Sequence, residues 1–158
     1  MKTPTEIWRA APRIRDGSLR PIDLVEACLE RIADQDGSIG AWVTIDAAGA
    51  RRSAQRLGQE VADSHYRGPL HGIPVGVKDI VDVADMPTRA GSNLTDPSPR
   101  TDDAPVVAGL RQAGAVVLGK TVTTPFAGFD PSPTRNPINL AHTPGGSSSG
   151  SAAAVAAG

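Results

Sequence analysis

Apolar residues recur every three or four positions in residues 21–33, and this spacing predicts a helix with one buried face. Residues 3–15 and the alanine-rich residues 47–62 predict two further helices. Between helices, residues 41–45 (AWVTI) are β-branched and aromatic, as in a strand. Cys28 lies beside the apolar positions of its helix, and we expect it to pack in the core.

The pattern changes after the third predicted helix. Residues 73–77 (IPVGV) alternate apolar with small residues, which predicts a strand and places Lys78 on its other face. Residues 103–113 predict a helix capped by Asp103, and the apolar residues 115–119 that follow it closely predict a buried strand. A helix leading directly into a buried strand indicates α/β layering.

The rest of the chain is dominated by one loop and one glycine- and serine-rich segment. After Lys120, residues 121–144 contain five prolines and show no periodicity, and ordered loops of this length are usually functional. Residues 145–158 (GGSSSGSAAAVAAG) then predict a loop that continues into an alanine-rich helix.

Composition and charge exclude several classes of function. The 16 Lys and Arg nearly balance the 17 Asp and Glu, so neither nucleic acid nor a membrane is the expected partner. One cysteine and three histidines give no zinc spacing, and we expect no metal and no cofactor. Arginines interrupt the apolar positions near the start, which predicts no signal peptide and a cytoplasmic location.

Two short motif matches fail in their context. Residues 114–121 (GAVVLGKT) fit the phosphate-loop pattern, but their apolar middle predicts a strand where a flexible anion-binding loop is required. Residues 146–150 (GSSSG) fit the nucleophile elbow with Ser148 as the nucleophile, yet no strand precedes them. A nucleotide-binding module therefore stays as a third hypothesis only.

A different chemistry joins Lys78 to the serine-rich loop. A lysine can act as a base for a serine when burial among neutral groups favours its uncharged form. Taken alone, however, a lysine at a strand end is usually solvated, and a Gly/Ser run is usually a linker or an anion-binding helix start. These residues by themselves leave the choice open.

Four segments, in order, match a known family: GIPVGVKD (72–79), DAPVVAGLRQAGAVVLGKT (103–121), TRNPIN (134–139) and TPGGSSSGSAAAVAAG (143–158). The chain resembles the amidase signature family, which includes bacterial amidases, the A subunit of glutamyl-tRNA amidotransferase and fatty acid amide hydrolase. The resemblance implies the N-terminal part of a single α/β amidase domain, with a mixed β-sheet flanked by helices and incomplete in this chain. Residues 1–66 would be mainly helical, and residues 67–158 would begin the catalytic core.

The resemblance also implies roles for individual residues. Lys78 would be the general base, and Ser147, after a cis peptide bond from Gly146, would be the bridging serine of a Ser–cis-Ser–Lys triad that hydrolyses amide C–N bonds. Two further groups follow from it: loop support from Gly145, Gly146, Ser148 and Ser149, and substrate lining by Ala127, Gly128 and Phe129.

Two departures from the family limit this expectation. In the family the nucleophilic serine lies about two dozen residues beyond the bridging serine, whereas this chain ends eleven residues after Ser147. The resemblance thus implies that the nucleophile and its oxyanion-stabilising amides are absent and that the chain alone is inactive. Pro125 stands where many relatives carry Glu, and Ser149 where many carry Gly.

The expected partners follow from these departures. A completed enzyme would take a small-molecule amide, and a complementary C-terminal chain is one candidate partner; the sequence leaves open a fragment, a truncated gene product and a split enzyme. The alternative, from a different class, is a non-catalytic remnant or half of a split enzyme that acts through such a chain. Strand edges left without neighbours also predict self-association.

Overall fold

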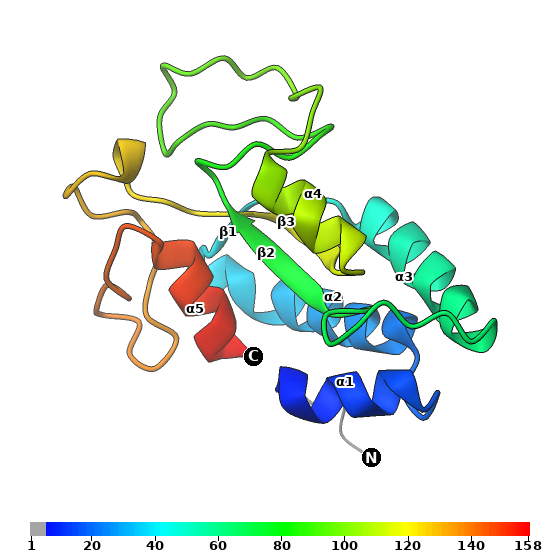
Figure 1. The fold of residues 1–158 in the computed structure, drawn as a ribbon. Coiled ribbons are helices and arrows are strands. Elements are labelled where there is room, and N and C mark those ends of the chain that lie inside the picture. The colour runs from blue at the N-terminus through cyan, green and yellow to red at the C-terminus, as the bar shows by residue number, and fades with distance from the viewer. Residues whose placement is uncertain (1–5) are drawn as a thin grey trace.

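A small β-sheet lies between layers of helices in the computed structural model, which describes residues 6–158 (Figure 1). The elements are α1 (Ile7–Arg15), α2 (Pro21–Ile39), β1 (Trp42–Ile45), α3 (Ala47–Ala62), β2 (Pro74–Lys78), α4 (Pro105–Gln112), β3 (Val116–Thr121), the short 3-10 helix η1 (Pro125–Ala127) and α5 (Ser149–Ala157). The helices and strands predicted from periodicity are confirmed. Residues 3–5 of the first predicted helix lie outside the described residues.

The sheet is mixed, with strand order β1-β3-β2. The central strand β3 is buried along its whole length and runs parallel to β2, to which α4 connects it, while β1 is antiparallel. This confirms the α/β class with a mixed sheet and flanking helices. Because β2 and β3 are parallel, their carboxyl ends meet at one edge, where Lys78 pairs with Thr121.

Alternation along β3 divides the core between the two faces of the sheet. Val116 and Leu118 pack against α2 and α3 on one face, and Val117 packs against α4 on the other. The first face buries Val25, Leu29, Ala50, Ala54 and Leu57, and the second buries Val77, Val83, Met86 and Val107. No helix within residues 6–158 is long and apolar enough to cross a membrane.

The helix predicted over residues 21–33 continues to Ile39. The polar residues 34–38 break the apolar repeat and hide this extension, but Ile39 is buried beside Ala41 and Ala153 of α5. Gly40 ends the helix in the left-handed conformation with φ +65°, which glycine adopts without steric cost.

The predicted Asp103 cap of α4 is wrong. The helix begins at Pro105 after Ala104, and no side chain caps it. The Asp103 carboxylate instead accepts a 2.9 Å hydrogen bond from the Ala84 amide and pairs with Arg111 at 2.9 Å. Its charge therefore ties the preceding loop to α4.

Gly119 in β3 generates a stability prediction. A Cβ there would lie 2.0 Å from the Thr44 carbonyl oxygen of β1, so Gly119→Ala forces β1 and β3 apart. We expect a loss of about 1–3 kcal/mol or more in the free energy of unfolding, measured by urea denaturation. The control is Gly109→Ala in α4, where no atom lies within 4 Å. Its expected gain is about 0.5–1 kcal/mol from helix propensity, and equal effects at both sites would contradict the prediction.

The edges of the sheet generate a second prediction. β1 and β2 are its outer strands within residues 6–158, and Val43 and Ile45 on β1 are exposed. Unpaired strand edges and exposed apolar side chains favour association. We therefore expect the isolated chain to form concentration-dependent oligomers in light scattering. A monodisperse monomer with a cooperative thermal transition would contradict this.

Candidate active site

Lys78 lies at the carboxyl end of β2 and faces away from the α4 layer. Its neighbour Val77 packs into the α4 core, and successive strand residues point to opposite faces. The Lys78 Nζ donates a hydrogen bond of 2.6 Å to Ser147 Oγ, although the two residues are 69 positions apart. The fold thus joins the two residues to which the resemblance assigns catalytic roles.

The segment after β3 holds the Ser147 backbone. The Gly146–Ser147 peptide bond is cis. The Ser147 carbonyl oxygen accepts hydrogen bonds from the Thr124 amide at 3.0 Å and from Thr123 Oγ1 at 3.2 Å. A Cβ at Gly146 would lie 3.0 Å from the Thr124 methyl carbon, so the loop approaches this segment closely. The carboxyl ends of both parallel strands therefore contribute to the position of Ser147.

Each of the other serines in the run has a different environment. The Ser149 hydroxyl is buried and accepts a 2.6 Å hydrogen bond from Ser132 Oγ. Ser151 Oγ lies 2.7 Å from Thr121 Oγ1 at the end of β3. Ser148 is exposed and caps no helical amide. In the described chain, Ser147 is thus the serine of this run that contacts a lysine.

The residues expected to line a substrate pocket lie at the end of η1 and just after it, with Ala127 half-buried and Gly128 and Phe129 exposed. Phe129 is fully exposed, and Gly128 is held through its carbonyl oxygen by Thr124 Oγ1 at 2.8 Å. Thr124 thereby connects this loop to Ser147, whose carbonyl its amide contacts. The substrate-lining role of Ala127, Gly128 and Phe129 stays a prediction.

Sequence reasoning missed several residues at the carboxyl ends of β2 and β3. Asp79 and Lys120 form an ion pair of 2.8 Å, and both side chains are almost fully buried. The threonines after β3 hold Ser147, as described above. A signal for these threonines was present, because Thr123 and Thr124 lie a few residues after the end of a predicted buried strand. No group of three or more potential metal ligands occurs within residues 6–158.

Comparison with known proteins identifies the family. The family model named Amidase matches residues 23–158. The chain belongs to the amidase family. The A subunit of glutamyl-tRNA(Gln) amidotransferase from Desulforapulum autotrophicum is 42% identical over 148 residues, covering 89% of this chain and 30% of that protein. The same subunit from Exiguobacterium sibiricum is 40% identical over 151 residues, covering 92% of this chain and 31% of that protein.

About a third of a solved amidase has the same fold as this amidase-family chain. The structure of peptide amidase from Stenotrophomonas maltophilia matches with a TM-score of 0.88 at 39% identity. The match covers 96% of this chain and 34% of the peptide amidase. The chain thus spans about a third of the length of the relatives it matches.

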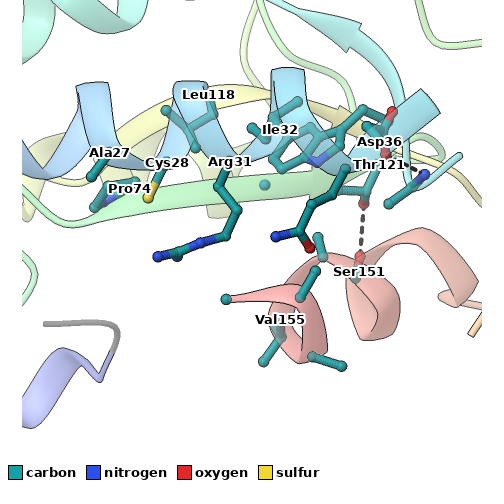
Figure 2. A pocket seen from close by; sticks show the side chains of 18 of the residues that line it. Ala27, Cys28, Arg31, Ile32, Asp36, Pro74, Leu118, Thr121, Ser151 and Val155 are labelled. Atoms are coloured by element: carbon teal, nitrogen blue, oxygen red, sulfur yellow. Dashed lines mark hydrogen bonds between the residues drawn. The ribbon is translucent and has the colours of Figure 1, made fainter. Parts of the chain in front are cut away.

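A cavity of about 620 Å³ opens between α2, α5 and the sheet of this amidase-family chain (Figure 2). Apolar side chains from the three elements, including Ile32, Leu118 and Val155, line it (Figure 2). Its lining residues do not include Lys78 or Ser147. This cavity is therefore separate from the lysine–serine contact.

Cys28 is half-buried, in contact with the α2–α3 core on one side and lining this cavity on the other. The prediction that it packs in the core therefore holds only in part. Burial raises the pKa of the Cys28 thiol because it disfavours the thiolate, and the nearby positive charge of Arg31 lowers the pKa by less.

The Cys28 environment predicts slow thiol chemistry. Because the folded-state pKa is raised, less thiolate is present at pH 7–8 than in the unfolded chain. We expect the rate of iodoacetamide alkylation to rise with pH along a curve displaced to higher pH from that of the urea-unfolded chain. Cys28 is the one cysteine in the sequence, so mass spectrometry reports it alone. A curve displaced to lower pH would contradict the prediction.

Proposed function

We propose that this chain supplies the base and the bridging serine of an amidase that cleaves amide C–N bonds. Lys78 acts as the general base, and Ser147 is the bridging serine of a Ser–cis-Ser–Lys triad. The nucleophilic serine comes from polypeptide other than residues 1–158. The observation that carries the proposal is the 2.6 Å contact between Lys78 Nζ and Ser147 Oγ.

The contact suits a proton relay. An uncharged Lys78 accepts the proton of Ser147 Oγ, which in turn accepts the proton of the nucleophilic serine as that oxygen attacks the amide carbon. Collapse of the tetrahedral intermediate breaks the C–N bond, and the proton returns through Ser147 to the leaving nitrogen. Water then hydrolyses the acyl ester.

The surroundings of Ser147 support a relay role over a nucleophilic one. Its hydroxyl accepts from Lys78, and Thr123 and Thr124 hold its carbonyl oxygen. A relay group needs a fixed position between two partners, which these contacts supply. Ser148 is exposed and has neither a lysine nor a capped amide as a partner, which disfavours the elbow interpretation.

The names of the relatives indicate the class of substrate but not its identity. One solved relative is a peptide amidase, and the curated relatives are amidotransferase subunits. Both names concern amides. We therefore propose a carboxamide substrate and assign neither its acyl group nor its amine.

A chimaera tests the assignment of Lys78. Residues 23–158 replace the matching third of the Stenotrophomonas maltophilia peptide amidase, and hydrolysis of a peptide amide is followed. Lys78→Ala should lower kcat by at least about a hundredfold, the lower range for loss of a general base. Lys78→Arg should not restore turnover, because a guanidinium stays protonated. Activity of Lys78→Ala within a few-fold of the parent chimaera would refute the assignment.

Neighbouring serines supply the matched control. Ser147→Ala should lose turnover as Lys78→Ala does, whereas Ser148→Ala should stay within a few-fold of the parent chimaera. The 158-residue chain alone should hydrolyse no amide above background, since loss of one oxyanion donor already costs about 10²- to 10³-fold. Labelling of Ser148 in that chain by a fluorophosphonate would instead support the elbow.

A further inference from the structure

Two charged side chains beside the proposed site are removed from water. The Lys120 side chain is 0% exposed and that of Asp79 is 1% exposed, with Lys120 Nζ 2.8 Å from Asp79 Oδ1. Removing two charges from water is costly unless they are paired and hydrogen-bonded. One member of the pair, Asp79, directly follows Lys78 in the chain, so the pair lies next to the proposed base.

Lys120 connects the central strand to the loop that follows β2. It lies on β3, and its Nζ donates hydrogen bonds of 3.0 Å to the Pro87 carbonyl oxygen and 3.0 Å to Thr88 Oγ1. Together with the ion pair to Asp79, these give the ammonium group three polar contacts, two of them hydrogen bonds. The loop after β2 is therefore fastened to the most buried strand of the sheet.

Asp79 is held at several points. Its amide donates to the Thr121 carbonyl oxygen at 3.0 Å, and its own carbonyl oxygen accepts from the Ala90 amide at 2.9 Å. Its second carboxylate oxygen accepts from the Arg89 amide at 3.2 Å. With the Lys120 contact, backbone and side chain of this residue are both fixed.

Lys78 directly precedes Asp79, and the contacts of Asp79 restrict the position of the Lys78 backbone. Within residues 6–158, β2 is an outer strand of five residues, with an irregular register between Val75 and Gly76. Lys78 is the last residue of this strand, so the direction in which its side chain leaves the sheet depends on how the residues that follow are held. Fixing Asp79 fixes the Cα of Lys78 and so the origin of its long side chain.

We propose that the buried Asp79–Lys120 ion pair positions Lys78, so that its amine meets Ser147. This inference rests on the proposed function and adds two positioning residues to it. The pair acts in a second way as well. Lys120 neutralises the carboxylate next to Lys78, so that no unpaired negative charge competes with Ser147 for the Lys78 amine.

Because the chain has few lysines, NMR can test the positioning of Lys78 without a measurement of turnover. The sequence has three lysines, Lys2, Lys78 and Lys120. In a chain labelled with [ε-13C]lysine, NMR therefore gives three side-chain signals, which single Lys→Met variants assign. Ser147→Ala removes the hydroxyl that contacts Lys78, and its effect on the Lys78 signal measures that contact.

The test is a double-mutant cycle in which the chemical shift of the Lys78 NMR signal is measured. We expect Ser147→Ala to displace the Lys78 signal in the parent chain. In an Asp79→Asn background that displacement should fall roughly twofold or more, because the two sites are coupled. The control is Asp103→Asn, which removes a carboxylate from the Asp103–Arg111 pair beside α4 and should leave the displacement unchanged.

The outcomes distinguish failure of the proposed function from failure of the inference that the ion pair positions Lys78. No response of Lys78 to Ser147→Ala in the parent chain would refute the contact on which the proposed function rests. A full-sized response in both the parent and the Asp79→Asn chain would refute positioning and leave the proposed function intact. Asp79→Asn/Lys120→Met leaves no unpaired buried charge and should show the same reduced response. Loss of the helical circular dichroism in both variants would assign the pair to folding alone and overturn the inference.

Discussion

The parallel pairing of β2 with β3 is the constraint on which the rest of the arrangement depends. It brings Lys78 and Thr121, which are far apart in sequence, opposite each other at the carboxyl ends of the two strands. In open α/β sheets, binding sites form at the carboxyl ends of parallel strands. Here one strand end presents the lysine, and the segment after the other holds the serine.

The close approach of α5 to the sheet depends on a residue without a side chain. Gly150 lies so close to β1 and to the end of β3 that a Cβ there would be 2.3 Å from both the Ala41 carbonyl oxygen and the Val122 amide nitrogen. Its own amide donates to the Val122 carbonyl oxygen at 2.9 Å. The glycine lets α5 begin against the sheet, and the position of α5 in turn determines where the preceding Ser147 lies. The Gly/Ser composition thus serves close packing first and chemistry second.

Periodicity predicted most of the secondary structure because the responsible contacts are local or alternate regularly. The apolar repeats of α2 and α3 and the alternation before Lys78 each follow from one element burying one face. The end of α2 and the role of Asp103 were missed, since each depends on a partner distant in sequence, Ile39 on α5 and Asp103 on Ala84. The contact between Lys78 and Ser147 was reached through family resemblance, because spacing alone does not show which distant loop meets a strand end.

Lys120 shows how burial changes the meaning of a motif. In the sequence it completes GAVVLGKT, where a phosphate-loop lysine would reach an anion. In the fold residues 116–121 are a strand, and the ammonium group is fully buried against Asp79, Pro87 and Thr88. The group already contacts a carboxylate, a carbonyl oxygen and a hydroxyl oxygen, and an incoming phosphate would have to displace that carboxylate inside the core. The lysine that suggested a nucleotide therefore belongs to the support of the proposed amidase site.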